Sequence, residues 1–429
     1  MAFRPDAYQH VRDFIDFVAA SPSSYHAARE GARRLAQAGW RQQSELDAWE
    51  AAPGGHYLVR GGALMAWWVP EAVTDDSAFR IVGSHTDSPS FKLKPQPETS
   101  SVGYQQAAVE VYGGPLIGSW SDRELGFAGV VVDAEGEEHL VETGPVARIP
   151  QLAIHLNRSV NEEGLKLGKQ THTAPVLAMQ SGGAPSLLEC LALSAGIEAS
   201  MIRGHDVYAF DTNEGALFGA GDEFIASGRM DNLTSVHASV VAMLEVTGDY
   251  SGRDVLVLAA FDHEEVGSES ITGASGPILA DVLTRTSRAL GNDADAFDRM
   301  IRRSWCISSD AGHAVHPNYV GHHDPGHHPV LGGGPLLKVN ANQRYASDAA
   351  GAALWSAACE AVGTKAQPFV SNNDLPCGST IGPLTATRLG IRTVDVGVPL
   401  LSMHSAREMA SVSDLADMAG ALAAVYAGR

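Results

Sequence analysis

Four short apolar runs, each ending in a cluster of polar residues, constrain the fold of this chain most strongly. The runs occupy residues 79–83, 255–261, 305–307 and 392–397. Continuous apolar runs of this length are typical of strands buried on both faces of a parallel sheet, and functional groups gather at the carboxyl ends of such strands. The sequence therefore predicts an α/β fold with a mostly parallel sheet flanked by helices.

Helical patterns lie at both ends of the chain and between the runs. Apolar residues recur at helical spacing over residues 8–35, with a break at the turn Ser21-Pro22-Ser23-Ser24. This pattern predicts an α-rich beginning. Later helices are predicted over residues 231–246, 346–362 and 413–426, and Ser413 is the candidate N-cap of the last one.

Residues 92–224 differ from the rest of the chain. They contain Gly-rich turns and alternating apolar and polar segments at residues 107–112, 127–133 and 138–142. Alternation with a period of two is typical of strands with one buried face. We expect a β-rich unit inserted into the α/β domain, which would then be discontinuous and comprise residues 1–91 and 225–429.

Length and charge limit the classes of protein to consider. The chain has 429 residues, enough for more than one domain, and a formal net charge of −20. This charge argues against a nucleic-acid or anionic-membrane partner, and no run approaches the about 18 apolar residues that cross a bilayer. The start lacks the pattern of a signal peptide, and the four cysteines lack paired spacing. These features predict a soluble cytoplasmic protein with reduced thiols.

Two adjacent acids, Glu264 and Glu265, follow the apolar run at residues 255–261. Neighbouring carboxylates at the end of a buried strand are costly to place unless chemistry uses them. In a metal site, one carboxylate can hold the ion while the other carries a proton. The pair therefore indicates a hydrolytic metal centre as the first hypothesis.

Other candidate metal donors lie near the remaining strands and helices. They are His85, Asp231, Asp310 and His404, with Asp87 two residues after the first histidine. Taken singly, such residues more often belong to turns, helix N-caps or the core. The set includes two imidazoles and three carboxylates, which suit zinc or a similar divalent ion. The imidazoles are those of His85 and His404, and the carboxylates are those of Asp231, Glu265 and Asp310. One carboxylate can bridge two ions, and Glu264 stays free to accept a proton from an activated water.

The strings around these residues resemble the aspartyl aminopeptidase family of cytosolic metallopeptidases. They occur in the family's order and span nearly the whole chain. The strings are GSHTDSP (83–89), IHLNR (154–158), VNE (160–162), RMDNL (229–233), FDHEEVGS (261–268), HAVHPNY (313–319), LKVNANQRY (337–345), DLPCGSTIGP (374–383) and LSMHS (401–405). Such a set is a specific signal, whereas any one string could occur by chance.

The resemblance implies a two-metal exopeptidase that removes N-terminal acidic residues, with Asp preferred over Glu. Asp87 would orient His85, and Glu264 would act as general base and later as general acid. Zn²⁺ suits the donors best, and Co²⁺ or Mn²⁺ could replace it. By the family pattern, one ion would be held by His85, Asp231 and Asp310, and the other by Asp231, Glu265 and His404, with Asp231 bridging them.

The same resemblance implies the substrate contacts. Lys338 matches a family lysine that faces the acidic side chain of the substrate, although without the family a solvated lysine at a strand edge is the simpler interpretation. His155 matches a catalytic histidine that reaches the active site of a neighbouring subunit and helps to stabilise the developing oxyanion. Gly378 and Ser379 open an apparent helix, where backbone donors could bind a carboxylate or a helix could simply begin. His316 and Tyr345 are expected to line the pocket.

The inserted region resembles the family's dimerisation domain, which implies a large homo-oligomer, commonly a dodecamer built from dimers. A His-rich segment at residues 321–328 looks like a metal tract, but its Pro-Gly turn favours an exposed loop. Three alternative functions stay open: a two-metal aminopeptidase of another specificity, an amidohydrolase acting on N-acylated amino acids, and a non-catalytic metal-dependent scaffold.

Overall fold

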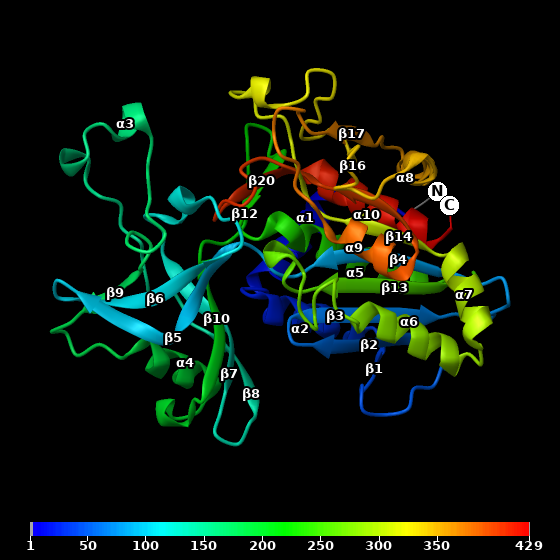
Figure 1. Ribbon diagram of the computed structural model, residues 1–429, viewed down its shortest axis with the longest axis horizontal. Coiled ribbons are helices and arrows are strands. Elements are labelled where there is room, and N and C mark those ends of the chain that lie inside the picture. Colours follow the sequence, from blue (N-terminus) through cyan, green and yellow to red (C-terminus); the bar gives the residue numbers. More distant parts are fainter. Residues whose placement is uncertain (1–2, 429) are drawn as a thin grey trace.

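Two units, each built on its own sheet, make up the molecule. The computed structural model describes residues 3–428. An α/β unit contains a nine-stranded sheet, and a smaller inserted unit contains a six-stranded sheet (Figure 1). Among the described residues, no helix is long and apolar enough to cross a membrane, and all four cysteines are free thiols.

The centre of the nine-stranded sheet is parallel. Its adjacent strands β13 (Val255–Phe261), β4 (Phe79–His85), β14 (Trp305–Ser309) and β18 (Arg392–Gly397) correspond to the four predicted runs. Antiparallel pairs flank this centre, between β3 and β13 and between β16 and β18. The outer strands are β1 (Arg41–Gln42), β2 (Gly54–Arg60), β3 (Ala63–Val69), β16 (Leu336–Val339) and β17 (Gln367–Val370). The predicted α/β fold is confirmed, with mixed edges on the sheet.

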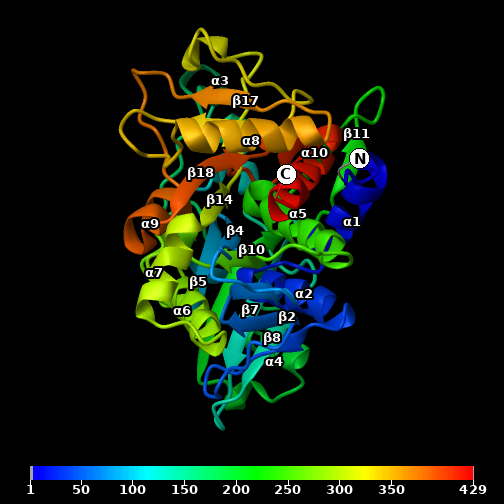
Figure 2. The ribbon, with the colours of Figure 1, turned by 90° about the vertical axis from the view of Figure 1, so that its right-hand side faces the viewer.

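Helices cover both faces of this sheet, which explains why its central strands are apolar throughout. Every residue of β13 is buried, and its side chains alternate between two cores, with Leu256 and Leu258 in one and Val255 and Val257 in the other. Figure 2 shows α5 and α10 on one side of the sheet and α6, α7 and α9 on the other. The helices of this unit are α1 (Ala7–Ala19), α2 (Ser24–Gln37), α5 (Met230–Thr247), α6 (Ile278–Ala289), α7 (Ala294–Arg303), α8 (Ala349–Ala361), α9 (Ile381–Leu389) and α10 (Val412–Tyr426).

The helix boundaries correct two details of the prediction. The predicted break separates α1 from α2. Ser411, however, caps α10, and its side chain accepts a hydrogen bond from the backbone N–H of Ser413. The prediction of Ser413 as N-cap is wrong because β20 (Glu408–Ser411) leads directly into the helix, so Ser411 is the last residue with extended backbone. Asp348 caps α8, which begins later than predicted.

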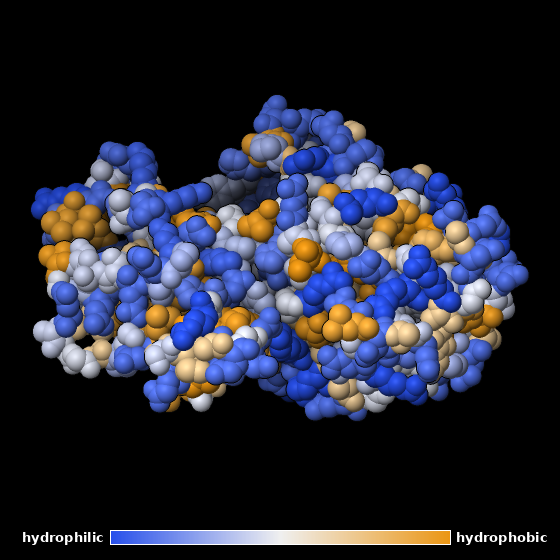
Figure 3. Space-filling view, turned by 60° about the horizontal axis from the view of Figure 1, so that its bottom comes forward, coloured by the Kyte–Doolittle hydropathy of each residue, from blue (hydrophilic) through white to orange (hydrophobic). Residues whose placement is uncertain are grey.

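The inserted unit is an antiparallel sheet with its own core. Phe91, Phe127 and Leu191 lie in this core, between the sheet and α4 (Leu187–Ala195). A loop that carries α3 (Val160–Glu163) projects beyond the sheet (Figure 1). Figure 3 shows a largely hydrophilic surface with scattered apolar patches, including one at the outer end of this unit. Its strands are β5 (Ser90–Ser101), β6 (Tyr104–Tyr112), β7 (Leu125–Val132), β8 (Glu138–Glu142), β9 (Val176–Met179) and β10 (Gly204–Asp211).

A small sheet lies where the chain returns from the inserted unit. Strand β12 (Phe224–Ser227) pairs with β11 (Ala216–Phe218) on one side and with β20 on the other. The predicted boundary between residues 224 and 225 therefore falls inside a strand. Because β12 leads into α5 and β20 follows residue 404, this pairing brings two distant candidate ligands together.

Candidate metal centre

The predicted metal donors converge at the carboxyl edge of the central parallel strands. His85 is the last residue of β4, Asp310 directly follows β14, and Glu265 lies in the short 3-10 helix after β13. Because these three strands are neighbours, their ends meet at one place. Asp231 approaches from the first turn of α5, where the backbone departs from helical geometry. His404 completes the group from the loop before β20.

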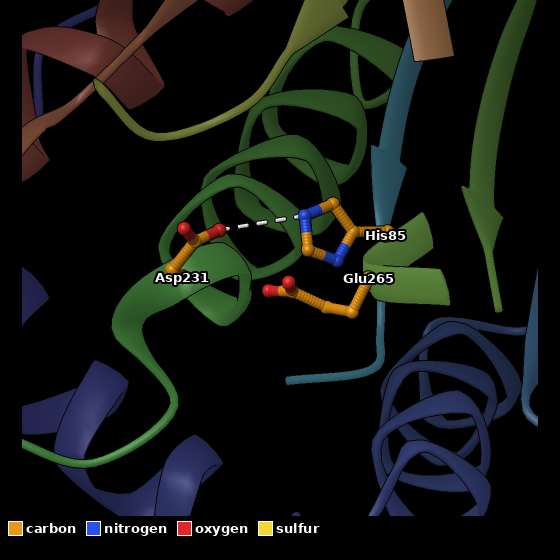
Figure 4. Close-up of side chains that lie close together, drawn as sticks. All are labelled: His85, Asp231 and Glu265. Carbon is orange, nitrogen blue, oxygen red and sulfur yellow. Dashed lines mark ion pairs between the residues drawn. The ribbon is translucent and has the colours of Figure 1, made fainter. Parts of the chain in front are cut away.

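Asp231 lies between the two imidazoles. Its Oδ1 is 3.4 Å from Nε2 of His85, and its Oδ2 is 3.4 Å from Nε2 of His404. Nε2 of His85 also lies 3.4 Å from Asp310 Oδ1, and Nε2 of His404 lies 3.5 Å from Glu265 Oε1. Figure 4 shows His85, Asp231 and Glu265 turned toward a common space. A carboxylate that offers one oxygen to each side has the arrangement of a bridging ligand.

These residues fit a divalent cation. His85, Asp231 and Glu265 each offer one donor atom, and the three atoms lie within 4.8 Å of one another. Asp231 Oδ1 and Glu265 Oε1 are buried and accept no hydrogen bond from residues 3–428. Leaving such oxygens unpaired is costly. A cation would satisfy them, and imidazole with carboxylate is a donor set that zinc prefers.

Burial and neighbouring charges shift the pKa values of several residues in the cluster. Burial raises the pKa of Glu264 to about 8, and the charges of Asp310 and Asp87 act in the same direction. Burial and the nearby Asp231 raise the pKa of Glu265 well above its usual range. Burial alone would lower the pKa of His404, but the Asp231 carboxylate, 3.4 Å from its Nε2, and the charge of Glu265 raise it to about 10. A cation bound to these groups would compete with protons, so its affinity should depend on pH.

Asp87 supports the first imidazole and the acidic pair at once. Its Oδ1 lies 3.4 Å from Nδ1 of His85, and its backbone carbonyl lies 3.0 Å from the same nitrogen. The backbone N–H groups of Glu264 and Glu265 donate to its carboxylate at 3.0 and 3.1 Å. Acceptors at Nδ1 favour the tautomer that leaves Nε2 free to bind a metal.

Glu408 is a supporting residue that the sequence analysis missed. It is 2% exposed, and its two oxygens accept hydrogen bonds from the backbone N–H groups of His404, at 2.8 Å, and Asp231, at 3.0 Å. Burial and the charge of Asp231 raise its pKa to about 8. The sequence signal was weak, because one acid at the start of a strand has many ordinary roles. Tyr112 and Gly114, from the inserted unit, were missed as well.

A cleft of about 460 Å³ opens beside the cluster, and Lys338 lies in its wall. Lys338 is 2% exposed, which rules out the solvated-lysine interpretation. Its Nζ donates to the carbonyl of Ala311 at 2.7 Å and lies 3.5 Å from Asp310 Oδ2. The predicted substrate residues Tyr345, Gly378 and Ser379 also line the cleft.

Two predicted site residues lie elsewhere. His316 does not line the cleft, and its Nδ1 accepts a hydrogen bond from the backbone N–H of Asn318 at 3.1 Å. His155 is exposed on the inserted unit, in the short turn Ile154–Leu156, outside the cleft of its own subunit. The His-rich segment at residues 321–328 is a largely exposed loop, as expected.

Comparison with known proteins gives the family. Residues 17–426 match the family described as aminopeptidase I zinc metalloprotease (M18). The chain belongs to the M18 aminopeptidase family. A probable M18 family aminopeptidase 2 of Streptomyces avermitilis is 50% identical over 424 residues, covering 98% of this chain and 98% of that protein. Its counterpart in Pseudomonas aeruginosa strain LESB58 is 44% identical, covering 96% of this chain and 97% of the relative.

Solved M18 structures share the whole fold. The chain superposes on a structure titled "Cryo-EM structure of the Ape4 and Nbr1 complex" with a TM-score of 0.94 and 34% identity, covering 98% of this chain and 86% of that one. For "Structure of S. cerevesiae mApe1 dodecamer" the TM-score is 0.85 and the identity 28%, covering 98% and 99% of the two chains. The resemblance found in the sequence is confirmed at the level of the family, and this M18 protein is a metal-dependent aminopeptidase.

Proposed function

We propose that this M18 aminopeptidase removes N-terminal Asp, and less efficiently Glu, from peptides in the cytoplasm. The observation that carries the proposal is the buried ammonium of Lys338 in the wall of the cleft. The chain carries a net charge of −20, and the cleft is also lined by Asp231, Glu264, Glu265 and Asp310. An acidic substrate side chain needs a cation to enter such surroundings.

Lys338 has a donor available for this purpose. An ammonium carries three N–H donors. Lys338 donates one of them to the Ala311 carbonyl, and its Nζ forms an ion pair with the Asp310 carboxylate at 3.5 Å. A metal ion on Asp310 would share the charge of that carboxylate and free Lys338 for the substrate. Because packing holds the lysine in place, its reach is fixed. A difference of one methylene is worth about 1–3 kcal/mol in a hydrophobic pocket, and we expect a fixed ammonium to discriminate between Asp and Glu on a similar scale.

Two divalent ions, most suitably Zn²⁺ with Co²⁺ or Mn²⁺ as replacements, would lower the pKa of a bound water and polarise the scissile carbonyl. Their proposed ligands are His85, Asp231 and Asp310 on one side, and Asp231, Glu265 and His404 on the other. Glu264 lines the cleft beside these ligands. We assign it the transfer of a proton from the attacking water to the leaving amine. Tyr345, Gly378 and Ser379 would position the peptide.

The inserted unit, residues 92–224, is proposed to join two subunits. It exposes Leu152, Ile154 and Leu156 around His155, and exposed apolar groups of this kind favour association. His155 would then reach the active site of a neighbouring subunit, within a dodecamer like the one named for S. cerevesiae mApe1. Light scattering combined with activity assays tests this assembly, and a fully active monomer would contradict it.

Substitution of Lys338 tests the specificity. In Lys338→Met we expect kcat/KM for an Asp-terminated peptide to fall about 30-fold or more, because loss of one partner from a buried charge pair costs about 2–5 kcal/mol. A Leu-terminated peptide should change by less than about 3-fold, since an apolar side chain makes no ionic contact with Lys338. Steady-state kinetics on Asp, Glu and Leu peptides measure both effects.

Lys365→Met serves as the matched control, because Lys365 is exposed and outside the cleft. An equal loss on all three peptides would assign Lys338 a structural role only. A wild-type enzyme that prefers the Leu peptide would favour a two-metal aminopeptidase of another specificity.

A further inference from the structure

A short segment of the inserted unit runs along the loop that carries His404. The backbone N–H of Leu116 donates to the carbonyl of His404 at 2.8 Å, and the backbone N–H of Ala406 donates to Oγ of Ser119 at 2.9 Å. These contacts join residues that are nearly 300 positions apart in the chain. The segment at residues 112–119, here called the clamp segment, therefore connects the inserted unit to the metal centre.

The clamp segment begins at a tyrosine that reaches the first imidazole through Asp87. The hydroxyl of Tyr112, the last residue of β6, donates to Asp87 Oδ2 at 2.8 Å. The other oxygen of Asp87 lies 3.4 Å from Nδ1 of His85. Tyr112 is 8% exposed, so this hydrogen bond is shielded from water. The inserted unit thus holds Asp87, whose carboxylate, at 3.4 Å, and backbone carbonyl, at 3.0 Å, both face Nδ1 of His85.

The same segment contacts the second imidazole directly. The carbonyl of Gly114 lies 3.0 Å from Nδ1 of His404, so Nδ1–H can donate to it while Nε2 faces Asp231 and Glu265. Gly113 has a φ of +68°, and a Cβ added there would lie 3.1 Å from Cβ of Glu265. Glycine is required at this close approach.

We propose that the clamp segment is a positioning element through which the inserted unit sets the orientation of both metal-binding imidazoles, and so the affinity of the site for metal. Partners that hold metal-ligating histidines typically contribute about 10- to 100-fold in affinity. Tyr112 is the positioning residue of the first imidazole and Gly114 supplies the acceptor for the second. This role is separate from subunit contact, and it rests on the two-ion site proposed above.

Tyr112→Phe tests the proposal because it removes one hydroxyl and little else. Asp87 retains the backbone donors of Glu264 and Glu265, so its carboxylate stays partnered in the variant. Tyr208→Phe is the matched control. Tyr208 is also 8% exposed, its ring packs 5.1 Å from that of Tyr112, and its hydroxyl makes no hydrogen bond to another residue within 3–428.

The measurement is the dissociation constant for zinc, by competition with a chelator, together with the melting temperature of the metal-free proteins. We expect the constant for one ion to rise about 10- to 100-fold in Tyr112→Phe and less than about 3-fold in Tyr208→Phe. The effect should persist in a His404→Ala background, which retains the ion of His85. Ser119→Ala, which loosens the other end of the clamp segment, should weaken the ion of His404.

Equal zinc constants in wild type, Tyr112→Phe and Ser119→Ala would overturn the proposal. So would parallel losses of zinc affinity and metal-free melting temperature in Tyr112→Phe and Tyr208→Phe, because the tyrosine would then serve packing alone. A wild-type protein that binds no zinc would refute the metal site itself, and the positioning role with it.

Discussion

The two halves of the metal centre hold similar side chains in different surroundings. The inner half, built around His85, is sealed, since that imidazole is 1% exposed and its Nδ1 faces both the backbone carbonyl of Asp87, at 3.0 Å, and the carboxylate of Asp87, at 3.4 Å. The outer half, built around His404, is open, since that imidazole is 32% exposed and its Nδ1 faces a backbone carbonyl. A negatively charged partner makes an imidazole more basic than a neutral carbonyl does. We therefore expect the two proposed ions, although bound by like donors, to differ in affinity.

Glu264→Gln should lower kcat more than any other substitution considered. It should not change the difference in metal affinity between the two halves. The substitution removes the proposed proton carrier while every proposed ligand stays, so we expect kcat to fall about 10²- to 10⁴-fold with zinc content unchanged. Steady-state kinetics and elemental analysis measure the two quantities. Glu269→Gln, at an exposed position nearby, is the control. Full activity with metal bound would show that Glu264 is not the proton carrier.

Stepwise removal of metal tests whether the two halves bind metal with different affinities. The ion of the outer half should leave first as chelator is added, because water reaches His404 more readily than His85. We expect the two dissociation constants to differ by about tenfold or more, the scale that supporting partners provide. Zinc stoichiometry and residual activity are followed in the same titration. Loss of both ions in one step would show that the two halves bind metal with equal affinity.

The smallest expected effect concerns stability and pH. In the metal-free protein, Glu264 and Glu408 have pKa values raised from 4.5 to about 8, so the stability they contribute is present below pH 4.5 and is lost as the pH rises toward 8. His404, with its pKa raised to about 10, acts in the same direction at higher pH.

Zinc replaces these protons and removes the repulsion between the carboxylates, so it should raise the melting temperature more at pH 8 than at pH 5. Each kcal/mol of added stability corresponds to about 2–4 °C in a domain of this order of size. Thermal unfolding with and without zinc at the two pH values measures the difference. An equal shift at both would mean that the buried acids do not control the stability of the site.

The sequence predicted the centre of the large sheet because burial on both faces requires continuous apolar runs, and β13 and β18 begin and end where their runs do. The direction of a strand, in contrast, does not follow from its apolar run. An apolar run has the same composition in either direction, so the antiparallel placement of β3 and β16 could not be predicted from it. The N-cap of α10 was missed by two residues because two neighbouring serines were both plausible caps.

Most of the candidate ligands could be placed at one edge of the sheet because they lie at or just after a strand end, or at a helix start, which local patterns locate. His404 is the exception, since it lies in the loop before β20. Glu408 and Tyr112 could not be predicted, because each acts on a residue far away in the chain: Glu408 on the backbone of Asp231, and Tyr112 on the carboxylate of Asp87. The burial of Lys338 was equally hidden, since the sequence gives its strand but not what covers it.

The proposed ligands are spread over more than 300 positions of the chain, from His85 to His404. A ribosome synthesises a chain from its N-terminus, so N-terminal domains can fold while later ones are still being made. A nascent chain of this protein can expose His85 and Asp87 long before Glu265, Asp310 and His404 exist. The complete centre can form only after residue 404 has been made. A chain that stops before this residue lacks the outer half of the site.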